Sequence, residues 1–218
     1  WFRSARLGPG HPHHDWYVWS DTPDRYRGVR VMFPDAEPAN WTLAPECGRY
    51  YWHRFYPHQP DLNYDHPEVR REMLDVARFW LALGVDGFRV DAAPYLFERE
   101  GTACEGLPET HAFLRELRTL ADTFEPPRIL LAEANQRPEE LVPYFGAGDE
   151  FHLAFHFPLI TACFLGLRRE SAAPIRHVLP FIGPRPPPIS MQHSASNCLR
   201  AATSFTPLGI STAFSIGS

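Results

Sequence analysis

The sequence predicts an α/β protein in which parallel strand–helix units follow an irregular, aromatic-rich segment. Two observations support this fold class. From residue 67 onward, stretches in which apolar residues recur at helical spacing alternate with short apolar runs that are typical of buried strands. Before that point, glycine, proline and aspartate residues separate short aromatic runs, and helical periodicity is weak. The chain has 218 residues, of which 44% are hydrophobic, so it is long enough to bury a core.

Residues 1–65 are predicted to form a unit of short strands and turns. The runs Trp16–Trp19, Val29–Phe33 and Tyr50–Trp52 are rich in aromatic and β-branched residues, which favour strands. Gly8–Gly10 and Asp21–Asp24 indicate turns. The aromatic side chains serve either as core or as platforms for a sugar ring, and packing is the commoner role.

From residue 67 the alternation predicts parallel βα units. The expected elements are, in order, a helix from Pro67 to Leu83, a strand from Val85 to Val90, a helix that begins near Pro108, a strand from Ile129 to Ala132, a short helix from Pro138 to Phe145, a strand from Leu153 to Phe157 and a helical stretch that ends near Glu170. Pro67 suits the first turn of its helix, and Gly84 suits the end.

Charge and composition argue against several function classes. A net charge of −5 gives no reason to expect a nucleic-acid or anionic-membrane partner. No apolar run approaches the length of a transmembrane helix. Cys47, Cys104, Cys163 and Cys198 are far apart, which favours a reducing cytoplasm over a disulfide framework or a zinc site. The histidines of the turn at 11–14 have no Cys or Glu at metal-ligand spacing, so a transition-metal site is disfavoured.

Two carboxylates stand directly after predicted strands. Asp91 follows the strand that ends at Val90, and Glu133 follows the strand Ile129–Ala132. Catalytic groups of parallel βα folds gather at the carboxyl ends of strands, and only one helix separates these two strands, so we expect them to be neighbours. Such a pair suits retaining glycoside chemistry, in which one carboxylate is the nucleophile and the other the proton donor. The alternative is that each carboxylate only caps a helix or pairs with a base.

Arg89 alternates onto the same strand face as Asp91. Its fixed positive charge is expected to keep Asp91 ionised at neutral pH. Glu133, in contrast, must have a raised pKa if it is to hold a proton at neutral pH and donate it.

Three motifs resemble those of the α-amylase family of (β/α)₈-barrel glycosidases and transglycosylases. Gly87–Ala92 resembles the strand that bears the family's nucleophile, and Leu131–Asn135 resembles its acid/base strand. Gln59–Asn63 resembles the short motif near the end of the family's B domain, in the variant typical of α-glucosidase-like members. The three motifs occur in the family's order and spacing.

Longer stretches narrow the resemblance to trehalose synthases, the members that interconvert maltose and trehalose. They are Asp15–Asp21, most of Pro94–His111, and Phe151–Pro158. Arg137 departs from this pattern, because a tryptophan is expected there. The resemblance implies a partial (β/α)₈ TIM barrel in residues 66–175, with residues 1–65 as an irregular B-domain-like insertion.

The resemblance also implies the chemistry, a retaining double displacement that isomerises maltose to trehalose. Asp91 would be the nucleophile and Glu133 the acid/base, with Arg89, Gln59 and Asn135 as substrate-binding residues. No catalytic cofactor is implied. The alternatives are a hydrolytic α-glucosidase of the same family and an inactive truncated product.

Some members of the family bind calcium, a hard cation that takes carboxylate and carbonyl oxygens. The matching positions are the side chains of Asp61 and Glu98 and the backbone oxygens of Tyr95 or Leu96. The alternative is that these carboxylates cap or bridge structural elements without a metal.

The last part of the chain has a different composition. Residues 171–218 contain no Asp or Glu, whereas the first 170 residues hold all 26. From residue 176 we interpret the chain as an out-of-family tail, disordered or translated in a shifted reading frame. The family's His-Asp motif is expected there, but His193 is followed by Ser194. We expect the chain to be a fragment of a longer cytoplasmic enzyme, one able to form a homo-oligomer.

Overall fold

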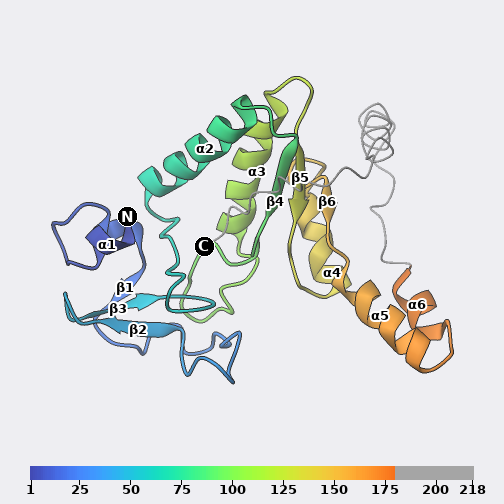
Figure 1. Cartoon of the computed structure of the whole chain (residues 1–218), viewed down its shortest axis with the longest axis horizontal. Coiled ribbons are helices and arrows are strands. Elements are labelled where there is room, and N and C mark those ends of the chain that lie inside the picture. Colours follow the sequence, from blue (N-terminus) through green and yellow to red (C-terminus); the bar gives the residue numbers. More distant parts are fainter. Residues whose placement is uncertain (180–218) are drawn as a thin grey trace.

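The structure, a computed structural model, describes residues 1–179 and shows two units (Figure 1). The first unit is a small antiparallel sheet with short helical turns, and the second is a three-stranded parallel sheet flanked by helices. The tail predicted from residue 176 lies outside the described residues, except for its first four. Those include the end of α6 (Ala173–Val178), so a boundary at residue 176 falls inside a helix.

The N-terminal unit is built around one short sheet. Its elements are α1 (Phe2–Ala5), the 3₁₀ turn η1 (His14–Trp16), β1 (Trp19–Ser20), β2 (Trp41–Ala44) and β3 (Arg49–Trp52). The strands pair antiparallel in the order β1-β3-β2, so the strand predicted at Tyr50–Trp52 is confirmed. The strand predicted at Trp16–Trp19 is reduced to its last residue, because Trp16 ends η1 and Tyr17 makes only an isolated bridge to Leu62.

The prediction of a strand at Val29–Phe33 is wrong. The Val29 N–H bonds back to the carbonyl of Tyr26 in a turn, 3.0 Å away. The Asn40 side chain donates to the carbonyls of both Val29 and Arg30, at 3.4 and 3.2 Å. A side chain therefore satisfies the backbone groups that a neighbouring strand would otherwise bond.

Aromatic rings form the core of the N-terminal unit. The rings of Trp41 and Trp52 meet edge to face with centroids 5.1 Å apart, and Tyr26 stacks on Trp41 at 5.9 Å. A second cluster joins Tyr17 and Trp19 to other buried residues. These rings pack against one another, which supports the core role for them over the role of sugar platforms.

The second unit follows the predicted alternation. Its elements are α2 (Pro67–Ala82), β4 (Gly87–Val90), α3 (Pro108–Asp122), β5 (Ile129–Ala132), α4 (Pro138–Leu141), the 3₁₀ turn η2 (Val142–Phe145), β6 (Leu153–Ala154), α5 (Phe157–Arg168) and α6. The strands are parallel and lie in the order β4-β5-β6. Three parallel strands are thus present in residues 1–179, as expected for part of a larger barrel.

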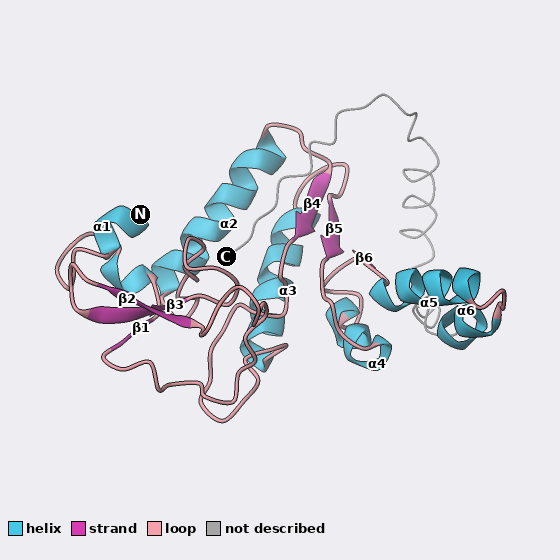
Figure 2. Cartoon of the chain, turned by 60° about the horizontal axis from the view of Figure 1, so that its bottom comes forward, coloured by secondary structure: helices cyan, strands magenta, loops and turns pink. Residues whose placement is uncertain are grey.

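Helices α2 and α3 cover the sheet and define its core. His66 caps α2 by accepting a hydrogen bond from the Glu68 N–H at 3.3 Å, and a proline occupies the first turn of each helix. Their apolar faces are buried together with the strands. The two helices lie side by side next to β4 in both views (Figures 1 and 2).

Gly87 begins β4 at a point where the backbone of β5 comes very close. A Cβ at Gly87 would lie 1.9 Å from the carbonyl oxygen of Ile129, its partner in the strand register. No other residue type fits without displacing β5, so this glycine fixes the spacing of the two strands.

The third strand is shorter than predicted. Leu153–Phe157 was expected to be extended, but β6 ends at Ala154 and α5 begins at Phe157. The reason is a cap, because the His156 side chain accepts the Leu159 N–H at 3.0 Å. Helices α5 and α6 project away from the sheet (Figure 1). Within residues 1–179 no helix combines the length and apolar character needed to cross a membrane.

Candidate active site

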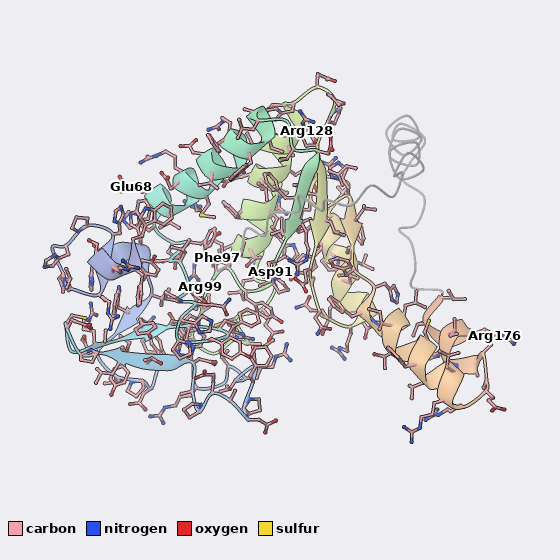
Figure 3. All side chains as sticks on the ribbon, viewed as in Figure 1. Glu68, Asp91, Phe97, Arg99, Arg128 and Arg176 are labelled. Carbon is pink, nitrogen blue, oxygen red and sulfur yellow. The ribbon has the colours of Figure 1, made fainter. Side chains whose placement is uncertain are left out.

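The carboxyl ends of β4 and β5 bring Asp91 and Glu133 together. Val90 pairs with Ala132 in the parallel register, so the two carboxylates are the next residues along neighbouring strands. Backbone hydrogen bonds hold the ends in place, from the Glu133 N–H to Val90 at 3.0 Å and from the Ala93 N–H to Glu133 at 3.3 Å. Figure 3 shows Asp91 at the end of β4 that faces the N-terminal unit, opposite Arg128. The predicted adjacency of the strands is confirmed.

Arg89 lies between the two carboxylates. Its Nη2 donates to Oδ1 of Asp91 at 2.9 Å and also to Oε2 of Glu133. All three side chains are partly exposed, at 31% for Arg89, 41% for Asp91 and 26% for Glu133. They are therefore held by one another and remain open to a small molecule.

The pKa of Glu133 is raised to about 7. The largest cause is a side-chain hydrogen bond with Asp91, followed by burial and by the negative charge of Asp91, while Arg89 acts in the opposite direction. A carboxyl that keeps its proton near pH 7 can donate it. The direction is the one expected from the sequence for a proton donor.

The loop after Asp91 begins under backbone constraint. Ala92 adopts φ +49°, a left-handed conformation that is unusual for a residue with a side chain. Ala92 and Ala93 are both buried, and Ala93 is fully enclosed. The surrounding packing therefore imposes the turn that redirects the chain immediately beyond Asp91.

The third strand end contributes Phe155, which the sequence interpretation does not single out. Its N–H bonds the Ala132 carbonyl at 3.1 Å, which sets it beside the end of β5. The Arg89 guanidinium lies 6.0 Å from the centre of the Phe155 ring, and Phe155 is 37% exposed. Functional side chains gather just after strand ends. The predicted strand runs to Phe157, whereas β6 ends at Ala154, so the sequence does not mark Phe155 as a residue that follows a strand end.

The other predicted substrate-binding residues occupy different places. Asn135 is exposed two residues after Glu133, in the same loop. Gln59 is exposed in a turn, where its N–H bonds the Tyr56 carbonyl at 2.8 Å. The hydrogen bonds found among residues 1–179 do not join the Gln59 side chain to the carboxylate pair.

Asp61 and Glu98, the predicted calcium ligands, are both buried. Oδ2 of Asp61 accepts the Arg54 N–H at 3.1 Å, whereas Oδ1 is buried and has no hydrogen-bond partner among the described residues. Burial raises the pKa of Asp61 to about 7, and burial together with the charge of Asp61 raises that of Glu98. Two buried carboxyl groups that disfavour each other's charge suit a hard cation.

Carboxylates alone do not complete a metal site here. Across residues 1–179 no group of three or more His, Cys, Asp or Glu side chains is arranged to hold a metal ion. Further ligands would have to be backbone oxygens, and Tyr95 and Leu96 lie buried in the segment that leads to Glu98. Asp61, with its unpartnered buried Oδ1, and Glu98 are therefore the two described residues whose chemistry suits a hard cation.

The histidines near the N-terminus have structural contacts. Nδ1 of His14 lies 2.7 Å from the carbonyl oxygen of Ala5, and its ring stacks on Trp19 with centroids 4.7 Å apart. His14 is buried in the N-terminal unit, which favours packing over metal binding.

Comparison with known proteins places this site in a family. The family model of the α-amylase catalytic domain matches residues 1–177. A trehalose synthase/amylase of Mycolicibacterium smegmatis is 57% identical over 190 residues, which cover 85% of this chain and 32% of that protein. A trehalose synthase of Thermus thermophilus is 57% identical over 180 residues, or 82% of this chain and 19% of that protein.

A crystal structure of a mutant of the trehalulose synthase MutB in complex with Tris has a TM-score of 0.64. It is 30% identical, and the match covers 73% of this chain and 31% of that one. The chain thus spans about a third or less of the length of the proteins it is compared with. On the strength of the family model and of these relatives, the chain belongs to the α-amylase family.

Proposed function

We propose that this chain is the part of a trehalose synthase that supplies the nucleophile and the acid/base for isomerising maltose to trehalose. The observation that carries the proposal is the pair Asp91 and Glu133, set on the ends of neighbouring parallel strands and joined through Arg89. The relatives at 57% identity are trehalose synthases by name, which supports the choice of reaction.

In the first displacement Asp91 attacks the anomeric carbon of the non-reducing glucose unit. Glu133 protonates the glycosidic oxygen, and the second glucose leaves. A pKa of about 7 keeps a proton on Glu133 at neutral pH, while the guanidinium of Arg89 favours the carboxylate form of Asp91. The product of this step is a glucosyl unit bound covalently to Asp91.

In the second displacement Glu133, now a carboxylate, accepts a proton from the anomeric hydroxyl of the released glucose. That oxygen attacks the glucosyl carbon, the bond to Asp91 breaks, and trehalose forms with retained configuration. Water must be kept away between the two steps, because its attack would give hydrolysis.

The units of the fold have separate roles in this proposal. Residues 1–65 correspond to a B-domain insertion that covers the site, and residues 66–175 correspond to part of the catalytic barrel. Asp91 lies at the end of β4 nearer the N-terminal unit, which supports this division (Figure 3). Arg89, Asn135 and Gln59 are proposed to bind the glucose units, with Gln59 reaching the substrate from the N-terminal unit.

A calcium ion at Asp61 and Glu98 is proposed to join the two units. Asp61 lies at the end of the N-terminal unit, where its N–H bonds the Trp52 carbonyl at 3.1 Å. Glu98 belongs to the loop that follows Asp91. The metal would neutralise two buried carboxylates and take no part in the displacements.

The proposal is tested by grafting residues 1–177 into the matching segment of the Mycolicibacterium smegmatis enzyme. The chimera is incubated with maltose, and trehalose is resolved from glucose. Trehalose is expected as the main product, and Asp91→Asn or Glu133→Gln should abolish it. Asp86→Asn is the matched control, because Asp86 is fully exposed and lies just before the other end of β4.

Two outcomes would contradict the proposal. Glucose as the main product would assign the chain to the hydrolytic α-glucosidases instead. Unchanged trehalose formation by the Asp91→Asn chimera would remove Asp91 from the nucleophile role. The 218-residue chain by itself is expected to give no turnover of maltose, and sustained conversion by it would overturn that expectation.

A further inference from the structure

Phe155 occupies the position on the third strand that Asp91 and Glu133 occupy on the first two. The parallel register pairs the last residue of β4 with the last residue of β5, and that residue with the last residue of β6. The three strands lie in this order in the sheet (Figures 1 and 2). Asp91, Glu133 and Phe155 are therefore the next residues along three neighbouring strands.

The backbone hydrogen bonds at these strand ends repeat. The Glu133 N–H bonds the Val90 carbonyl at 3.0 Å, and the Phe155 N–H bonds the Ala132 carbonyl at 3.1 Å. Each of the two residues is thus tied to the last residue of the neighbouring strand. Because side chains at equivalent positions of paired strands point to the same face of a sheet, those of Asp91, Glu133 and Phe155 form one row.

Arg89 interacts with all three members of this row. It lies two residues before Asp91, on the same face of β4. Its Nη2 donates to both carboxylates, and its guanidinium lies 6.0 Å from the centre of the Phe155 ring. An arginine at this distance is attracted by the negative face of an aromatic ring. The cation is therefore held from all three strand ends.

The chemistry of the ring suits this position. A phenyl ring attracts the guanidinium but competes only weakly for its N–H groups, so these remain available to Asp91 and Glu133. A third carboxylate at position 155 would compete for the same N–H groups, and an aliphatic side chain would not attract the cation. The backbone bond to β5 fixes Phe155, and the Phe157 ring lies 5.9 Å from the Phe155 ring, centre to centre.

We propose that Phe155 is a positioning residue whose ring holds the Arg89 guanidinium where one nitrogen serves both carboxylates. The inference rests on the proposed isomerisation, because it assigns a support to the nucleophile and the acid/base of that reaction. Phe155 acts through Arg89 and takes no part in the displacements. Without the ring, Arg89 keeps its contact with Asp91 on its own strand and loses part of its contact with Glu133 on the next.

The test follows the titration of Glu133 in the full 218-residue chain by carbon-13 NMR of the side-chain carboxyl groups. Among residues 1–179, the charged groups that change the pKa of Glu133 are Asp91, which raises it, and Arg89, which lowers it. Phe155→Leu weakens the hold on Arg89, so it is expected to raise the pKa of Glu133 by about half a unit, the shift that corresponds to the loss of an exposed cation–π contact.

Three further variants isolate the contribution of the ring. Phe155→Tyr keeps the ring, so its Glu133 is expected to titrate as in the wild type. Phe155→Met removes the ring with little change in volume and is expected to give the same shift as Phe155→Leu. It replaces the leucine variant if that variant does not fold, which the melting temperature checks. Phe33→Leu is the matched control and should leave the titration unchanged, because Phe33 is 39% exposed and belongs to the N-terminal unit.

The outcomes separate this inference from the function on which it rests. An unchanged or lower pKa of Glu133 in the folded variants that lack the ring would overturn the role of Phe155. A rise of equal size in Phe155→Tyr or Phe33→Leu would also overturn it, because a general loosening of the chain would then be the cause. Failure of the isomerisation appears instead as missing trehalose among the products of the chimera, and it leaves the Glu133 titration of the full chain unaffected.

Discussion

Nη2 of Arg89 lies 2.9 Å from Oδ1 of Asp91, two residues further along the same strand, and the same nitrogen also bonds Glu133 on the next strand. One guanidinium group therefore serves two carboxylates. The side chains at positions 89 and 91 share a strand face, so the contact follows directly from the alternation of a β-strand. It leaves Asp91 and Glu133 in contact with each other, and this contact determines the proton affinity of Glu133.

Asp91→Asn is expected to lower the pKa of Glu133 from about 7 toward the usual value for a glutamate. The substitution removes the negative charge and the carboxylate hydrogen bond that raise the pKa, while it keeps the size of the side chain. Carbon-13 NMR titration of the side-chain carboxyl groups measures the change. Asp86→Asn, just before the other end of β4, should leave the Glu133 titration unchanged. A Glu133 pKa that stays near 7 in Asp91→Asn would show that burial dominates.

The pH profile of the chimera should fall on the alkaline side of pH 7. Glu133 must be protonated to release the leaving glucose, and its pKa is about 7. With maltose as substrate, kcat/KM is therefore expected to drop about tenfold per pH unit above pH 7.5. An aryl α-glucoside with an acidic phenol as leaving group needs little protonation, so its glucosylation step should show a weaker decline. Identical alkaline limbs for the two substrates would argue against Glu133 as the proton donor.

Gly87→Ala should destabilise the chain by about 3 kcal/mol or more, because the added Cβ would lie 1.9 Å from the Ile129 carbonyl oxygen. The strands β4 and β5 would have to separate, and Asp91 and Glu133 would separate with them. Urea denaturation of the full chain measures the loss. Gly28→Ala is the control, since a Cβ there has open space, and its free energy of unfolding should change by less than about 0.5 kcal/mol. A Gly87→Ala protein as stable as the control would contradict the close approach of the two strands.

The second unit could be predicted well from the sequence because local patterns determine it. α2 has a proline at its first turn and a buried face at helical spacing, and its predicted end at Leu83 differs by one residue from the end at Ala82. The N-terminal unit was predicted less well. There, contacts between distant side chains decide the backbone, such as the Asn40 amide that occupies the carbonyl of Val29. A strand pattern in the sequence does not reveal which group will take its hydrogen bonds.

The candidate site shows the same contrast between features that local patterns determine and features that depend on distant contacts. Asp91 and Glu133 could be found because each follows a recognisable strand, and the direction of the Glu133 pKa could be expected from the chemistry. The contact between Arg30 and Glu105 could not be predicted, because the two residues come from segments 75 positions apart that meet only in the folded chain. Phe155 was missed for a simpler reason, the early end of β6.

Calcium should stabilise the full chain through Asp61. At a concentration about 100 times the dissociation constant, a ligand adds about 2.7 kcal/mol to the free energy of unfolding, which raises the melting temperature of a chain of this size by about 5 °C or more. Asp61→Asn should abolish this response. Asp75→Asn is the control, because Asp75 lies on the exposed side of α2, and it should keep the full calcium effect. An unchanged response in Asp61→Asn would show that calcium binds at a site that does not include Asp61.

The pH dependence of stability in the metal-free chain tests the burial of Asp61 independently. The pKa of Asp61 is about 7 in the folded chain against an ordinary value of 3.8, so the folded state holds a proton that the unfolded state releases. Its contribution to stability is complete below about pH 4 and is lost as the pH rises through 7. Asp61→Asn removes this loss, so the metal-free variant should melt at the same temperature as the wild type or higher at pH 8. A lower melting temperature would mean that the Asp61 carboxylate is stabilising without a metal.

The exposed face of α5 should make the full chain self-associate. Ile160, Phe164 and Leu167 recur at helical spacing and are 55%, 70% and 77% exposed, so one side of the helix presents apolar surface to water. Phe164→Gln combined with Leu167→Gln is expected to shift the sedimentation profile toward monomer, because the change removes the largest apolar side chains of that face. Leu43→Gln, at a residue 45% exposed on β2, serves as the control and should leave the profile as it is in the wild type. A wild-type chain that is monomeric at high micromolar concentration, or a double variant that associates as strongly as the wild type, would show that this face does not drive association.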